Sequence, residues 1–139
     1  MSELKNVFEW DRDRYTTYVD AMDGEHEGLI SIMNQLFQLN EKGGSKAQLL
    51  KLVEQLGVKT KEHFAHEEKF MDGIQGYQNQ QVHRMIHADL LKSYSLRAEQ
   101  FRSSPDAKLP EEFFTFLKFW LKSHICGIDR KYGEVVKAG

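Results

Sequence analysis

The feature that most constrains this chain is a histidine and a glutamate on the apolar side of a helical segment. Between Leu49 and Phe70, the side chains of one stripe recur at steps of four and three residues, as a core-facing helix face does: Leu49, Val53, Leu56, Thr60, His63, Glu67 and Phe70. His63 and Glu67 are separated by about 40° around such a helix. A carboxylate directed into a core is rare unless it is paired, neutralised or bound to a metal. We therefore expect the interior of the fold to hold a chemical partner for this pair.

Composition bounds the fold and the classes of partner. A length of 139 residues with 40% hydrophobic residues predicts one globular domain, residues 1–139. The chain has two prolines, and Val and Ile are sparse beside Leu, Phe, Glu and Lys, which favours helices over sheet. A net charge of −2, with acids and bases interspersed, gives no reason to expect nucleic acid or an anionic membrane as a partner.

Cysteine usage and the N-terminal sequence bear on the compartment. The single cysteine, Cys126, excludes an internal disulfide and a cluster of thiolate ligands. The first residues do not resemble a signal peptide, and no apolar window approaches the length of a membrane span. We therefore expect a soluble, cytoplasmic protein.

Periodicity and breaker residues predict an all-α fold with four amphipathic helices. The expected helices run from about 19–23 to 40, from the N-cap Ser45 to about 71, from about 79 to 102, and onward from Pro110. Residues 1–17 mix aromatic and charged side chains without helical periodicity and are expected to form an extended arm. Gly127 is expected to break the fourth helix before a short C-terminal helix near 129–136. Short connections then predict an antiparallel, up-down-up-down four-helix bundle.

In that topology the starts of the first and third helices lie at the same end as the finishes of the second and fourth. The residues expected to meet there, all directed inward, are His26, His63, Glu67, His83, His87 and His124. Taken singly, a histidine is more often a hydrogen-bonded core or surface residue than a ligand. Packing, however, gives no reason to cluster five of the six histidines with a glutamate in a core position.

The chemistry of this set indicates metal binding. Imidazoles and carboxylates without thiolates suit iron, and would also accept zinc or manganese. His124 and Asp129 lie about 140° apart around an uninterrupted helix, so Asp129 joins the set only if Gly127 breaks the helix. With Asp129 included, the ligands exceed what one ion takes from a protein, and two bridged metal ions are indicated.

Three neighbouring polar residues are expected to play lesser roles. Glu25 is one of the early acids that suit the positive end of the first helix. His66 lies off the core-facing stripe and is expected to be exposed or to support a ligand, whereas Glu68 is expected to be a solvated helix acid. Cys126 is expected to be an inert small hydrophobe, although its place between His124 and Asp129 leaves room for redox sensitivity.

Motifs spread over nearly the whole chain carry a family resemblance. The stretches are Phe8–Asp11, Met22–His26, His63–Glu68, Tyr77 leading to His83–His87, and Trp120–Tyr132. With them the chain resembles the hemerythrin family, in particular its single-domain bacterial members, the bacteriohemerythrins. It departs from the family pattern at Met22, where isoleucine is usual, and at Gln78, where proline often follows the tyrosine. Neither position is a ligand.

The resemblance implies a di-iron centre with a hydroxo or oxo bridge. One iron would be held by His83, His87 and His124, the other by His26 and His63 with an open coordination position, and Glu67 and Asp129 would bridge both. The implied function is reversible binding of dioxygen, for storage, delivery or sensing, without catalysis as the main role. Nitric oxide and azide are the other exogenous ligands expected, and the sequence leaves a protein partner for delivery or sensing open.

The residues around the open position should form an apolar wall that excludes water and slows autoxidation. The candidates for this oxygen pocket are Trp120, Leu121, Ile125 and Ile30.

The alternative from another class is a di-iron enzyme that reduces peroxide or nitric oxide, or that repairs iron–sulfur clusters. The related repair proteins usually add a cysteine-containing N-terminal segment, and residues 1–17 have no cysteine. A structural zinc bundle is a third interpretation, and the number of ligands disfavours it.

Overall fold

The computed structural model describes residues 20–74 and 80–120, and within them the chain forms four helices. These are α2 (Asp20–Glu41), α3 (Lys46–Asp72), α4 (Gln80–Ser103) and α5 (Glu111–Trp120). The starts of all four and the ends of the first three agree with the sequence prediction to within a few residues. The predicted arm over 1–17, the break at Gly127 and the short C-terminal helix over 129–136 lie outside the described residues.

The turn between α2 and α3 shows why these helices end and begin where they do. Gly43 has a φ of 77°, a left-handed conformation that glycine adopts without steric cost. A Cβ on Gly44 would lie 2.4 Å from Leu39 Cδ1, so any larger residue here would require the Leu39 side chain to move. Ser45 then caps α3, because its Oγ accepts a hydrogen bond from the Gln48 amide while the Gln48 side chain accepts one from the Ser45 amide.

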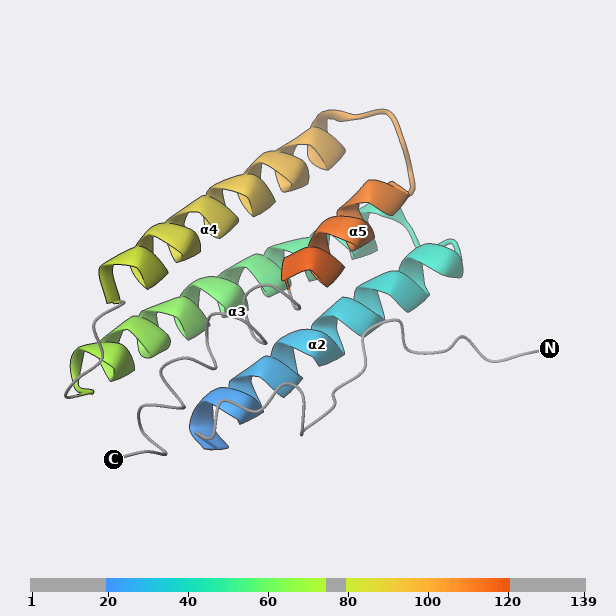
Figure 1. The fold of residues 1–139 in the computed structure, drawn as a ribbon. Helices are drawn as coiled ribbons and strands as arrows, with labels where there is room; N and C mark the ends of the chain where they lie inside the picture. The colour runs from blue at the N-terminus through green and yellow to red at the C-terminus, as the bar shows by residue number, and fades with distance from the viewer. Residues whose placement is uncertain (1–19, 75–79, 121–139) are drawn as a thin grey trace.

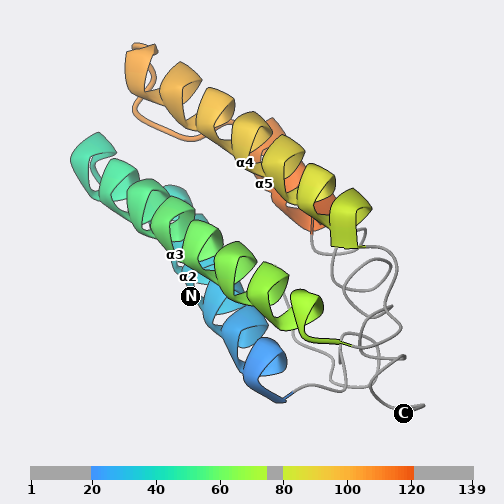
Figure 2. The ribbon, with the colours of Figure 1, turned by 90° about the vertical axis from the view of Figure 1, so that its left-hand side faces the viewer.

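The four helices form an all-α bundle in which consecutive helices run in opposite directions. The colour gradient in Figure 1 runs toward opposite ends along α2 and α3, and again along α4 and α5. Figure 2 shows two layers, α2 with α3 and α4 with α5, and α3 also packs against α4. None of the described helices is long and apolar enough to cross a membrane.

Aromatic side chains join α5 to the other helices. Phe114 meets Phe37 of α2 edge to face at 5.3 Å between ring centroids, and Phe113 lies 5.9 Å from Tyr94 of α4. Tyr94 in turn donates a hydrogen bond from its hydroxyl to the carbonyl of Val53 on α3, at 2.5 Å. Phe113 and Phe114 are both buried, so these ring contacts belong to the core.

We expect the hydrogen bonds of Asn40 to stabilise the contact between α2 and the segment that leads into α5. Its buried side chain donates to the Leu109 carbonyl at 3.2 Å and accepts from the Leu109 amide at 2.8 Å. Asn40→Ala should lower the free energy of unfolding by about 2–3 kcal/mol, because it removes two hydrogen bonds and leaves buried backbone groups without partners. Urea denaturation checks this. Gln35→Ala, on the exposed side of the same helix, is the control and should change stability by less than about 0.5 kcal/mol.

Candidate metal centre

Three helices bring five polar side chains together at one end of the bundle. His26 comes from α2, His63 and Glu67 from α3, and His83 and His87 from α4. All five are buried, and the exposed fraction of Glu67 is 0%. The predicted convergence of these residues is therefore confirmed. His124 and Asp129 lie outside the described residues, and their predicted place in the site stays a prediction.

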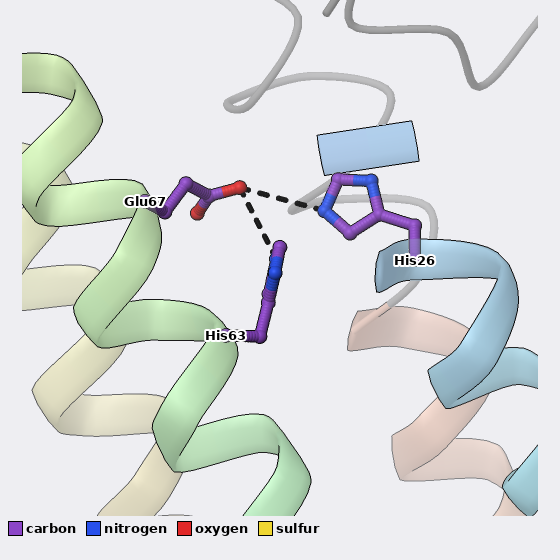
Figure 3. Close-up of side chains that lie close together, drawn as sticks. All are labelled: His26, His63 and Glu67. Carbon is purple, nitrogen blue, oxygen red and sulfur yellow. Dashed lines mark ion pairs between the residues drawn. The ribbon is translucent and has the colours of Figure 1, made fainter. Parts of the chain in front are cut away.

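Glu67 is the centre of the arrangement because its two carboxylate oxygens face different pairs of imidazoles. Oε2 lies 3.4 Å from His26 Nε2 and 3.2 Å from His63 Nε2 (Figure 3). Oε1 lies 2.8 Å from His87 Nε2 and 3.5 Å from His83 Nε2. In each of the two groups that share Glu67, the three potential ligand atoms lie within 4.8 Å of one another. The site thus has two adjoining halves, each of a size that one metal ion spans.

The hydrogen bonds at Nδ1, on the side of the ring away from Glu67, identify the tautomers of His63 and His87. His63 Nδ1 lies 2.6 Å from Glu25 Oε1, and His87 Nδ1 lies 3.0 Å from Glu68 Oε2. A carboxylate accepts, so Nδ1 of each ring carries a proton and a neutral ring directs a bare Nε2 lone pair toward Glu67. A lone pair facing a carboxylate oxygen in a buried site requires a cation between them, either a proton or a metal ion. His63 Nε2 is buried and lies 3.2 Å from Glu67 Oε2, with its lone pair directed into the site as that of a metal ligand is. The residues present therefore fit a metal centre.

In the metal-free protein, the surroundings of His63 favour a proton in this position. The hydrogen bond from His63 lowers the pKa of Glu25 despite the opposing effect of burial. For His63, burial favours the neutral ring, but the hydrogen bonds to Glu25 and Glu67 together outweigh it and raise the pKa of the imidazole. A metal ion must displace this proton in order to bind His63.

Apolar residues lie on both sides of the polar layer, which consists of His26, His63, Glu67, His83 and His87. Met22 and Met71, one helical turn beyond His26 and Glu67, pack together toward the end of the bundle. On the other side Phe64 stacks on His87, with centroids 3.9 Å apart and planes 4° apart, and Trp120 lies 6.1 Å from Phe64. Such a dry setting strengthens electrostatic interactions within the layer.

Two of the four predicted oxygen-pocket residues can be placed. Ile30 and Trp120 are buried in the main core below the polar layer. A small space of about 10 Å³ lies beside Trp120, and Ile30 does not line it. Leu121 and Ile125 lie outside the described residues, and the pocket stays a prediction.

Sequence reasoning missed the roles of two carboxylates. Glu25 contacts His63 of another helix, and Glu68, predicted to be a solvated acid, is only partly exposed and bonds to His87. The prediction for Glu68 was therefore wrong. A ligating histidine needs an acceptor for its second ring N–H, so acids adjacent in sequence to the ligands were the available signal. His66 agrees with its prediction, since it is 60% exposed and bonds to Glu25.

Comparisons with known proteins agree with this geometry. The model of the hemerythrin HHE cation binding domain matches residues 17–136. A hemerythrin of Sipunculus nudus is 33% identical over 134 residues, covering 96% of this chain and 97% of its own length. Bacteriohemerythrin of Pseudomonas aeruginosa is 28% identical over 126 residues, covering 91% and 80% respectively. A crystal structure of wild-type hemerythrin superposes with a TM-score of 0.81 at 23% identity, covering 94% of this chain and 98% of that one.

The raised pKa of His63 predicts how the stability of the metal-free protein depends on pH. Protonation of His63 stabilises the folded state, and this stabilisation is fully present below the pKa of the histidine in the unfolded chain, near 6.5. It is lost as the pH rises through the higher pKa that His63 has in the folded protein. Urea denaturation of the chelator-treated protein between about pH 6 and about pH 9 should show this loss. Glu25→Gln should flatten the dependence, whereas Glu62→Gln, an exposed acid paired only with Lys59 among the described contacts, should not. Equal slopes in all three proteins would contradict the assignment.

Proposed function

This chain belongs to the hemerythrin family, and we propose that it is a non-haem di-iron protein that binds dioxygen reversibly. The observation that carries the proposal is the fully buried Glu67, whose two oxygens each face two imidazole nitrogens. A carboxylate in such a position can bridge two cations, and without them it would be costly to bury.

We propose that each iron takes its ligands from one half of the site. His83, His87 and His124 would hold one ion, His26 and His63 the other, and Glu67 with Asp129 would bridge them. The tautomers support the assignment for the described histidines His63 and His87, since each directs Nε2 inward and donates from Nδ1 to a carboxylate. The donor set contains nitrogen and oxygen only, as iron in this kind of site requires.

The balance of donors favours oxygen binding over oxidation catalysis. Two ferrous ions, when bound, would supply the electrons that reversible oxygen binding needs. The described part of the site offers four imidazoles and one carboxylate, and a set poor in anionic donors stabilises high oxidation states less well. The chain's own contribution is to hold His26 and His63 in one half of the site and to exclude water with Met22, Met71 and the core.

The first prediction from this proposal concerns metal content. Elemental analysis after anaerobic iron loading should give about two irons per chain, because the site has two halves that share Glu67. Glu67→Ala should lower the content to one or less, since it removes the ligand common to both halves. Glu62→Ala, an exposed acid on the same helix, should keep both irons. A reproducible content near one in the unaltered protein would contradict the dinuclear site.

The second prediction concerns oxygen. The reduced, iron-loaded protein should become coloured on exposure to oxygen and bleach when oxygen is removed, as followed by optical titration. Ile30→Thr should speed irreversible oxidation while both irons are retained, because a hydroxyl one helical turn from His26 admits water. Val58→Thr is the control, since Val58 is 53% exposed on α3. Rapid irreversible oxidation of the unaltered protein, with catalytic turnover of peroxide or nitric oxide, would favour the enzyme alternative.

A further inference from the structure

Two chains of hydrogen bonds and ion pairs lead outward from Glu67, one from each half of the site. Each passes through the imidazole of a proposed ligand, continues to a partly exposed carboxylate, and ends on a charged or titratable side chain at the surface. The first consists of Glu67, His63, Glu25 and His66, and the second of Glu67, His87, Glu68, Arg84 and Asp72.

The first chain depends on Glu25, which crosses from α2 to α3. Its Oε1 accepts from His63 Nδ1 at 2.6 Å, and its Oε2 lies 3.0 Å from Nδ1 of the exposed His66. Glu25 and His66 line a groove of about 350 Å³ on the surface between α2 and α3, and His63 also forms part of its wall. Glu25 therefore holds the buried ring of His63, and its own carboxylate is accessible to solvent in this groove.

The second chain depends on Glu68, and it is more tightly anchored. Glu68 Oε2 accepts from His87 Nδ1 at 3.0 Å, while Oε1 accepts from Arg84 Nε at 3.2 Å. Arg84 also donates through Nη2 to Asp72, so its guanidinium is fixed by two carboxylates of α3. With Phe64 stacked on its ring, His87 is held at Nδ1, at Nε2 and on one face.

We propose that Glu25 and Glu68 are positioning residues for the metal centre, one for each half, and that Arg84 keeps Glu68 in place. The inference rests on the proposed function only in that His63 and His87 bind metal. A carboxylate at Nδ1 holds the ring in the tautomer that directs Nε2 to the metal, fixes the ring orientation and raises the basicity of Nε2. A purely structural role would be an interhelical ion pair, which leaves the ring nitrogens and the metal affinity unchanged.

The test uses zinc as the probe, because zinc is diamagnetic and accepts imidazole ligands. In the full chain loaded with zinc and labelled with ¹⁵N-histidine, His63 and His87 should each give a downfield Nδ1–H signal from a hydrogen bond to a carboxylate. Glu25→Gln should shift the His63 signal alone, and Glu68→Gln the His87 signal alone. Competition with a chelator should show that each variant weakens one of two zinc sites by about 10- to 100-fold.

Arg84→Gln provides an independent measurement, because Arg84 is 45% exposed and its replacement leaves Glu68 present. It should shift the His87 signal and weaken the same zinc site as Glu68→Gln, with no effect on His63. Glu62→Gln is the matched control, since it lies beside His63 in sequence and in the same groove, and it should change neither signal nor affinity.

The outcomes separate this inference from the proposed function. If the unaltered protein binds two zinc ions and all variants match it in both affinities and both signals, the positioning role is overturned. If the unaltered protein binds fewer than two zinc ions, the dinuclear site itself fails, whatever the variants do. Loss of stability without any change in the ring signals would also overturn the inference, because it is the result expected of a structural ion pair.

Discussion

The buried carboxylate of Glu67 is the constraint on which the rest of the structure depends. It lies at 0% exposure with four imidazoles around its two oxygens. An isolated carboxylate in such a position would be neutralised or would destabilise the fold. The helices that carry the imidazoles must therefore reach the same level of the bundle, and this requirement couples the packing of α2, α3 and α4 to the chemistry of the site.

Apolar packing on either side of Glu67 makes this coupling effective. The methionines Met22 and Met71 close one side, and the main core, with Phe64 and Trp120 nearest, closes the other. Because water is largely excluded, contacts within the polar layer are strong and any unmatched charge is costly. The same exclusion of water is what a centre that binds oxygen reversibly needs, so the features that support stability and the proposed function coincide.

In the part of the chain that the structure describes, side chains connect the site to the surface. Glu25 and Glu68 each contact one buried ring and remain about one-third exposed. They differ in their outer partners, since Glu68 is fixed by the permanently charged Arg84 and Glu25 is shared with the exposed His66. The two halves of the site are therefore built alike near Glu67 and differently at the surface.

The sequence by itself determined the helices, their order and the convergence of His26, His63, Glu67, His83 and His87, because helical periodicity and short connections fix which side chains share a face and an end. Tertiary structure alone decided that each oxygen of Glu67 serves its own pair of rings, and that Glu25 and Glu68 support His63 and His87. All of these contacts except the one between Glu67 and His63 join different helices, and they depend on helix rotation and side-chain rotamers to within an ångström. Periodicity specifies a face of a helix, whereas a hydrogen bond requires a position in space.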